Sequence, residues 1–229
     1  PTNNFSTMNP LFSVASTLTL SEGNLKVACN DVAASMIPST LLASSGKWYC
    51  EVINTGAQAG ESLVGVISNN QPNATGFSSK ESYTFYQYGN IQGAGESITS
   101  LTSGAFDATG DIMQFKLDLD SSPQTIAMKV NDGAWTADIS FVSITGATGT
   151  FWGFQARTGE GGAGQDMMWL FNFGQDSSFA GQTTAQGNQD DNGKGDFYYD
   201  VPAGYLAMCT DNLSDPEIAL PGENFNTVL

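Results

Sequence analysis

The feature that most constrains the fold is a strict two-residue alternation of apolar and polar side chains in the middle of the chain. In the segment "DIMQFKLDLD" the apolar side chains belong to Met113, Phe115, Leu117 and Leu119, and the polar ones between them to Gln114, Lys116, Asp118 and Asp120. Successive side chains of a β-strand point to opposite faces of a sheet. The pattern therefore predicts a strand whose apolar face lies on the core and whose carboxylates face solvent.

A second alternating segment, "TIAMKV", follows a turn at "SSPQ" and predicts the other strand of a hairpin. Charge favours the register in which Lys129 lies across from Asp118, because a slip of two residues would place Lys129 opposite Lys116. Asn131 and Asp132 precede a glycine in "NDG". This is the chemistry of a tight turn, so neither residue needs a ligand to explain it.

Short apolar or alternating segments recur along the chain between clusters of Gly, Ser, Asn and Pro, whereas helical periodicity is nearly absent. These segments are "GKWYCEVI", "SLVGVIS", "TFWGFQAR", "DMMWLFNFG" and "FYYDVPAGYLAMC". They predict an all-β fold of antiparallel sheets, and a chain of 229 residues is long enough for one such domain.

One glycine-rich segment, "GEGGAG" from Gly159 to Gly164, has the spacing of a nucleotide-binding loop. It lies between two predicted strands and opens no helix, so no helix N-terminus awaits a phosphate. We interpret it as a hairpin loop.

The charge balance limits the classes of partner. Seven Lys and Arg residues against 23 Asp and Glu residues give a net charge of -16, which disfavours nucleic acid and anionic membrane surfaces. No apolar run reaches the ~20 residues that span a bilayer. Cys29, Cys50 and Cys209 are widely spaced in a chain without histidine. This predicts free thiols rather than a zinc site, with one disulfide and a spare thiol as the alternative.

Catalytic groups are scarce. The absence of histidine excludes catalytic triads that use a histidine base. A glycosidase needs two carboxyl groups across a cleft, and the candidates by residue type are Glu51, Glu61, Glu81 and Glu96. No spacing singles out a pair, so we predict that the chain is not an enzyme, with a glycan-cleaving or lectin-like domain as the alternative.

Residues 175–196 are poor in apolar side chains and rich in Gly, Gln, Asn and Asp, which predicts a long surface loop. Four of its side chains are candidate calcium ligands, namely Asp190, Asp191, Asn192 and Asp196. Their spacing does not match an EF-hand, and solvated charge is the alternative interpretation. No cofactor other than this calcium ion is predicted.

The segment "SYTFYQYGN" carries four aromatic residues before a glycine-rich stretch. Tyrosines on loops offer a large contact area at low entropic cost and are typical of recognition surfaces. The alternative is that two of the four face the core of a strand.

Four segments, in order along the chain, resemble the SPRY domain family: "GKWYCEV", "TGDIMQFKLDLDSSPQTIAMKVNDGAW", "FNFGQDSSF" and "VPAGYLAMCTDNL". The resemblance implies a bent sandwich of two antiparallel sheets over residues 11–213, preceded by an N-terminal extension (1–10) and followed by a linker (214–229). It also implies a non-catalytic module that binds partners through loops at one end.

The resemblance also suggests the residues that contact a partner. Tyr86, Tyr88 and Asn90 match the family's "YGN"-type loop, and we add Trp135 and Arg157 as candidate contacts.

Three further segments, "NFGQDSSFAG", "TAQGNQDDNGKGDFYYDVPAGYLA" and "CTDNLSDPEI", resemble SPRY-like modules in structural proteins of tailed bacteriophages. This resemblance implies a virion protein, such as a tail fibre, assembled in the bacterial cytoplasm. The expected partners are other virion subunits, further copies of the chain, and a host surface protein or glycan. The end of the chain at "ENFNTVL" leads us to expect a piece of a longer protein.

Overall fold

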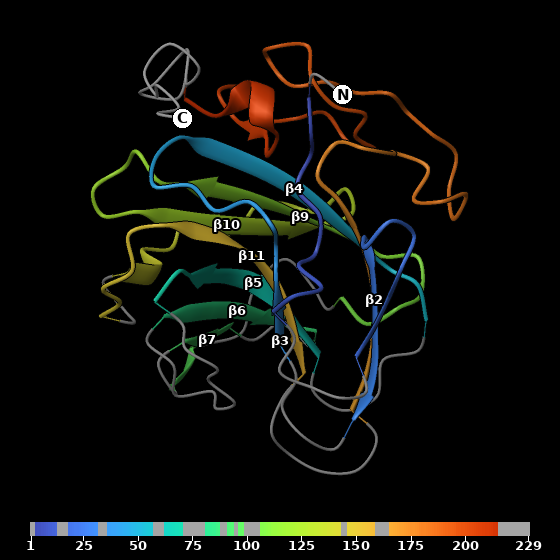
Figure 1. The fold of residues 1–229 in the computed structure, drawn as a ribbon, viewed down its shortest axis with the longest axis horizontal. Helices are drawn as coiled ribbons and strands as arrows, with labels where there is room; N and C mark the ends of the chain where they lie inside the picture. Colours follow the sequence, from blue (N-terminus) through green and yellow to red (C-terminus); the bar gives the residue numbers. More distant parts are fainter. Residues whose placement is uncertain are drawn as a thin grey trace, which may run out of the picture.

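The computed structural model shows two antiparallel sheets packed face to face, with an irregular third layer outside one of them (Figure 1). The structure describes residues 3–12, 18–31, 36–56, 62–70, 81–87, 91–93, 96–98, 106–142, 146–158 and 165–214. The predicted all-β sandwich is confirmed. In the described part of the chain, no helix is long and apolar enough to cross a membrane.

The first sheet has seven strands. Six of them pair antiparallel in the order β1 (Thr19–Ser21), β2 (Lys26–Asp31), β12 (Gln165–Asn172), β4 (Lys47–Asn54), β9 (Ile112–Asp118) and β10 (Thr125–Val130). The short strand β13 (Leu206–Ala207) pairs parallel with β4. The predicted hairpin thus forms one edge of this sheet.

The second sheet has six strands, in the order β3 (Met36–Pro38), β11 (Trp152–Thr158), β5 (Ser62–Ser68), β6 (Ser82–Tyr86), β7 (Ile91–Gly93) and β8 (Glu96–Ile98). β11 belongs to this sheet and β12 to the other, so the segment that contains "GEGGAG" connects strands of two different sheets. The interpretation of that connection as a hairpin loop is therefore wrong, and its residues lie outside the described part of the chain.

The main core fills the space between the sheets. Met113, Phe115 and Leu117 of β9 are fully buried in it, as the alternation predicted. The ring of Phe115 lies 5.6 Å from that of Phe85 and 6.2 Å from that of Phe154, and both of these rings come from the opposite sheet. Phe115 thus joins the two sheets.

The predicted register of the hairpin is wrong. Lys129 lies opposite Gln114, and Asp118 lies opposite Thr125. The carboxylate of Asp118 accepts hydrogen bonds from the backbone N–H groups of Asp120 and Ser121, each at 3.0 Å. These hydrogen bonds start a turn directly after β9. The loop between β9 and β10 is therefore longer than in the register that charge pairing predicted.

The cation that pairs with Asp118 comes from β4. Lys47 lies opposite Asp118 in the register, and its Nζ is 2.7 Å from the carboxylate. Hydrogen bonds from Lys47 and Ser121 lower the pKa of Asp118, against the opposing effect of burial.

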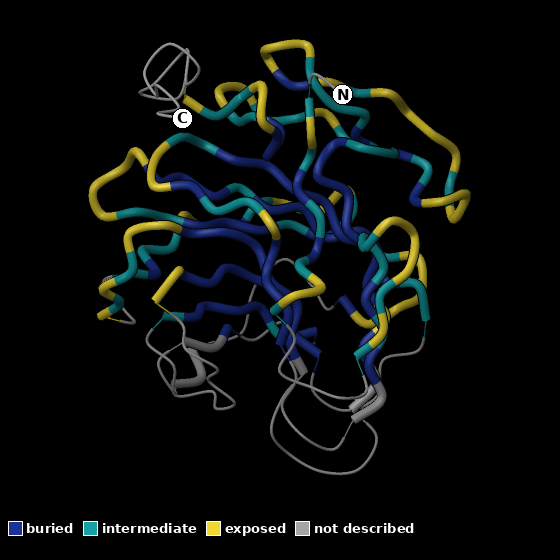
Figure 2. The backbone as a smooth tube through the Cα atoms, in the orientation of Figure 1, coloured by how far each residue is buried: buried dark blue, intermediate teal, exposed yellow. Residues whose placement is uncertain are grey.

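The polar face of β4 and β9 is covered by the third layer, called the outer layer below (Figures 1 and 2). A second apolar cluster forms there from Tyr49, Phe197, Ala207 and Cys209, all fully buried. Gln114, on the face expected to be solvated, is fully buried as well. That expectation is wrong, because the chain after β12 supplies apolar side chains to both faces of the sheet.

The N-terminal residues contact both this layer and the main core. Met8 is fully buried in the main core, and Phe5 packs on the second cluster and forms an isolated bridge with Cys209. Residues 3–10, expected to be an extension, are therefore part of the folded domain. All three cysteines are buried and free, as predicted.

Candidate functional site

The predicted aromatic loop is only partly described. Tyr83 and Phe85 of β6 are fully buried in the core, which agrees with the alternative interpretation of this segment. Tyr86, at the end of β6, is half-buried. Tyr88 and Asn90 lie outside the described residues.

Arg157 does not lie on the surface. It is part of β11, between β3 and β5, and is only 2% exposed. The prediction that Arg157 contacts a partner is therefore wrong, because its side chain is buried rather than exposed to a partner.

Trp135 lies in a lysine–aromatic array, which consists of Lys47, Lys116, Lys129, Trp135, Tyr199 and Tyr205. The Nζ atoms of Lys116 and Lys129 are 4.8 Å and 5.5 Å from the centroid of the Trp135 ring. Each of these two ammonium groups also contacts a tyrosine: Lys116 lies 5.6 Å from Tyr205 and Lys129 lies 5.5 Å from Tyr199. Cations and rings therefore alternate across the outer face of β4, β9 and β10.

Two carboxylates accompany the array. Asp118 pairs closely with Lys47, whereas Asp138 is 61% exposed and lies 3.6 Å from Lys116. That separation is longer than a charge-assisted hydrogen bond. Among the residues that the structure describes, no carboxylate lies within ion-pair distance of Lys129.

A cleft of about 250 Å³ lies at the core-facing side of Trp48 and Leu206. We call it the apolar cleft after its large side chains, Leu42, Trp48, Phe151, Leu206 and Leu213, although Ser44, Ser45, Asn212 and Ser214 also line it. Phe151 is 45% exposed, which is unusual for a residue of this size. The volume is below the ~300–1,000 Å³ of typical small-molecule pockets. It is suited to an apolar side chain of a protein partner.

Backbone contacts hold one wall of the cleft in place. Ala43 exchanges two hydrogen bonds with Trp152 of β11, at 2.9 Å and 2.7 Å. Gly46 has φ of +93°, and a Cβ at this position would lie 2.9 Å from the Trp48 ring. Only glycine combines this left-handed backbone with so close an approach to the indole ring. The Trp48 Nε1 in turn donates to the Ser45 carbonyl at 2.9 Å.

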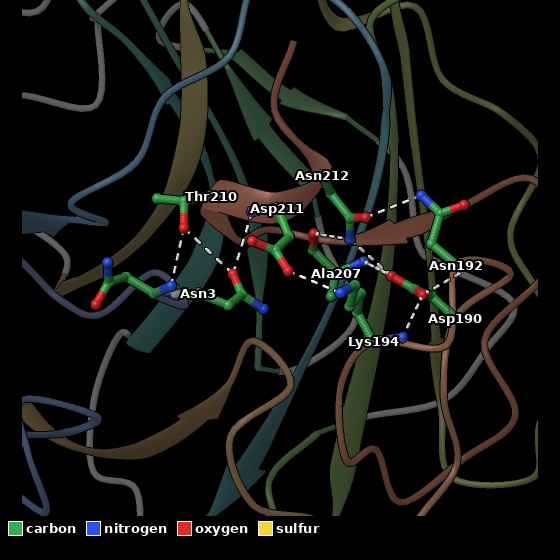
Figure 3. Close-up of polar contacts among 9 residues, drawn as sticks. Asn3, Asp190, Asn192, Lys194, Ala207, Thr210, Asp211 and Asn212 are labelled. Carbon is green, nitrogen blue, oxygen red and sulfur yellow. Dashed lines mark hydrogen bonds and ion pairs between the residues drawn. The ribbon is translucent and has the colours of Figure 1, made fainter. Parts of the chain in front are cut away.

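Asp190, one of the predicted calcium ligands, holds the segment that carries Leu206 and Leu213 of the cleft (Figure 3). The Asp190 carboxylate accepts four hydrogen bonds, from the N–H groups of Asn192, Lys194 and Ala207 and from the Asn212 amide, at 2.7–2.9 Å. Asn212 precedes Leu213 of the cleft. Asp190 therefore connects the loop to β13 and to the cleft.

The other candidate ligands do not converge on Asp190. Asp191 accepts a hydrogen bond from the Gly204 N–H at 2.7 Å, and Asn192 donates its amide to Asn212 at 2.9 Å. The Asp196 backbone carbonyl accepts from Asn172. Within the described ranges, no three carboxylate or thiolate groups are arranged to hold a metal ion. The Asp190 carboxylate is surrounded by hydrogen-bond donors, which occupy the positions that a cation would need. We therefore propose no calcium site here.

In its overall backbone, the chain is similar to the SPRY domain of human HERC1, with a TM-score of 0.55 and 12% sequence identity over 72% of this chain and 96% of that one. The chain has the SPRY fold. It is also similar to the TRIM65 PSpry domain, with a TM-score of 0.48 and 12% identity over 73% of this chain and 92% of that one. No family model and no curated protein matches the sequence. At this identity the likeness concerns the fold alone.

One buried acid of this SPRY-fold domain joins the outer layer to the sheet. Glu51 of β4 is fully buried and accepts hydrogen bonds from the Tyr198 and Tyr199 N–H groups, the Tyr49 hydroxyl and the Asn172 amide. Burial raises the pKa of Glu51 to about 7, although the donated hydrogen bonds oppose this shift. A group so enclosed does not meet a substrate.

The surroundings of Glu51 agree with a carboxyl group that holds a proton near neutral pH. The Tyr49 hydroxyl lies 2.9 Å from Glu51 Oε1 and 3.0 Å from Gln114 Oε1, but it has a single proton to donate. If Glu51 is protonated, it can donate to Tyr49, and Tyr49 can donate to Gln114. All three groups are then satisfied.

Raising the pH from about 5 to about 8 is expected to lower the free energy of unfolding, by at most about 3 kcal/mol. The pKa of Glu51 is about 7 in the folded state, above the value of about 4.3 in an unfolded chain. Between these values the folded protein holds a proton that the unfolded chain has lost, so stability decreases as pH rises. The chain has no histidine that would titrate in this range. Urea unfolding of the wild type and of Glu51→Gln would test this, since the variant should lose the slope.

Most residues of the array and the cleft were missed by the sequence analysis, Trp135 excepted. The cleft draws its side chains from four separate segments, which share no motif. The lysines of the array could have been found from the sequence. The chain has only seven cationic residues, and three of them, Lys47, Lys116 and Lys129, lie on the polar faces of predicted strands.

Proposed function

We propose that the chain is a non-catalytic module that binds a protein partner through the apolar cleft. The observation that carries this proposal is Phe151, a large apolar side chain that is 45% exposed at the edge of a cleft with rigid walls. A rigid apolar pocket that receives an anchor side chain is typical of protein interfaces. We therefore propose the cleft as the binding site, rather than the loop residues that the family resemblance suggested.

Two of the four candidate glycosidase acids support a non-catalytic role. Glu51 is fully buried. Glu81 accepts hydrogen bonds from the N–H groups of Thr148 and Gly149 at 2.8 Å and 3.0 Å and holds that turn. Glu61 lies outside the described residues, and so does the side chain of Glu96. The proposal includes no glycan cleavage.

We further propose that the module belongs to a virion protein of a tailed bacteriophage, such as a tail fibre. There the cleft would bind another virion subunit, a further copy of the chain, or a host surface protein. The support for this is the sequence resemblance of three segments after β12. An antibody against the chain should label purified phage particles at one structure of the tail, and particles free of the chain would contradict the assignment.

The cleft can be tested by replacing its exposed aromatic side chain. Phe151→Ser should abolish the selection of peptides with an apolar anchor from a random peptide library, because the partner's side chain loses one wall of its pocket. Leu11→Ser is the matched control, since Leu11 is 95% exposed and lies outside the cleft. Equal selection by the two variants would show that peptides bind elsewhere, and a wild-type chain that selects no peptide would contradict the proposed function.

A further inference from the structure

The turn before β11 is held by two side chains from other segments. Each of the four backbone N–H groups of residues 148–151 donates to one of these side chains. The Glu81 carboxylate accepts from the first two, at 2.8 Å and 3.0 Å, and the Asn69 amide oxygen accepts from the other two, each at 3.1 Å. We call Asn69, Glu81 and residues 148–151 the clasp. Its hydrogen bonds restrict a turn that would otherwise be among the more mobile parts of the fold.

Asn69 also continues the pairing of β5 with β11. The register of these strands ends at Ser68 and Trp152. One residue further, the Asn69 N–H donates to the Phe151 carbonyl at 2.9 Å. In a regular antiparallel pair the Phe151 N–H would donate to the Asn69 carbonyl, but here it donates to the Asn69 side chain. A single residue therefore binds both backbone groups of Phe151.

The clasp is connected to the rigid second sheet. The Ser68 N–H at the end of β5 donates to the Glu81 carbonyl at 2.9 Å, and the Ser68 hydroxyl donates to the Glu81 carboxylate. On the other side, Trp152 exchanges two hydrogen bonds with Ala43. The backbone of Phe151 is thus fixed from both directions, while its side chain stays 45% exposed at the cleft.

A fixed aromatic side chain favours binding in two ways. A side chain that is already held in place loses less entropy when a partner binds. A wall that cannot move also accepts a narrower range of anchor side chains than a wall that can adapt.

We infer that Asn69 and Glu81 are positioning residues for the proposed interaction. Through the clasp they hold Phe151 in the orientation in which it meets the partner, and they thereby limit which apolar side chains the cleft accepts. This inference rests on the proposed function and adds the residues that set the selectivity of the cleft.

The test compares two residues that each accept hydrogen bonds from two backbone N–H groups. The probe is a peptide selected on the wild type from a random library. Asn69→Ala removes one acceptor of the clasp. Asp176→Ala is the matched control, because Asp176 accepts from the N–H groups of Ser178 and Ala180, each at 2.8 Å, and does not line the cleft. Asn69→Asp retains an oxygen that can accept from the clasp.

Asn69→Ala should weaken binding of the peptide about tenfold, because Phe151 must then be ordered when the peptide binds. A library selected on Asn69→Ala should also yield a wider range of apolar anchors than one selected on the wild type. Asn69→Asp and Asp176→Ala should match the wild type in affinity and in the range of anchors. Urea unfolding of each variant separates these effects from a loss of stability.

Two results would overturn the inference. If Asn69→Ala binds the peptide as tightly as the wild type and selects the same anchors, Phe151 is positioned without the clasp. If Asp176→Ala weakens binding equally, the effect follows from general stability. Should Asn69→Ala fail to fold, Glu81→Ala removes the other acceptor of the clasp and is judged by the same comparison.

The failure of the proposed function gives a different result. If Phe151→Ser leaves peptide selection intact, the cleft is not the binding site. If Phe151→Ser abolishes selection while Asn69→Ala changes nothing, the cleft binds its partner and only the inference about the clasp is wrong.

Discussion

Glu51→Ala is expected to lower the free energy of unfolding by about 3 kcal/mol, and to loosen the outer layer before the sandwich unfolds. The substitution leaves two backbone N–H groups, those of Tyr198 and Tyr199, without their acceptor, and it removes one of the two acceptors of the Asn172 amide. Leaving a buried donor unsatisfied costs about 1–3 kcal/mol. The Glu51 carboxylate that accepts from these donors is itself fully buried.

Urea unfolding would measure the loss, and hydrogen exchange would locate it. The amides of Tyr198 and Tyr199 should exchange much faster in Glu51→Ala, while those of the central strand β5 keep their protection. Asp132→Ala is the control, because Asp132 is an exposed acid in a turn, and it should change stability by less than about 0.5 kcal/mol. Equal losses in the two variants would mean that Glu51 does not hold the layer.

Phe115→Ala is expected to lower the free energy of unfolding by about 3–5 kcal/mol. Its ring is fully buried and contacts Phe85 and Phe154 of the opposite sheet, so the cavity would open between two rigid layers that cannot close it. Urea unfolding at one pH would give the value. Phe151→Ala is the matched control, since Phe151 is partly exposed. A loss for Phe115→Ala no larger than for this control would contradict the described core.

The sequence predicts a strand well when the alternation within that strand decides which of its side chains are buried. In β9 the burial of Met113, Phe115 and Leu117 follows from their alternation, because parity decides which face an apolar side chain reaches. The register of the hairpin does not follow in this way. It depends on hydrogen bonds of Asp118 to the turn that follows, and these outweigh the charge pairing with Lys129.

The outer layer could not be predicted from periodicity, because residues 196–209 have no regular strand except β13. The alternation in β4 suggested a half-buried strand, yet Tyr49 and Glu51 are fully buried beneath this layer. The polar residues of β4 thus showed which side chains lie opposite the main core, but not that another layer covers them. The same loop residues that resembled a calcium site, above all Asp190, instead connect this layer to β13.

The position of the candidate site follows from the outer layer. Leu206 and Leu213 reach the cleft from the chain after β12, and Tyr199 and Tyr205 of the same segment hold the lysines of the array. The SPRY fold alone therefore does not provide this surface. We therefore propose that recognition takes place at the outer layer rather than at the end of β6, where the family resemblance suggested it.

The central claim is that a protein partner binds in the apolar cleft, and chemical-shift mapping with a selected peptide tests it most directly. We expect the resonances of Leu42, Leu206 and Leu213 to shift on addition of the peptide, while those of Tyr86 at the end of β6 remain unchanged. Shifts around Tyr86 without shifts in the cleft would contradict the account.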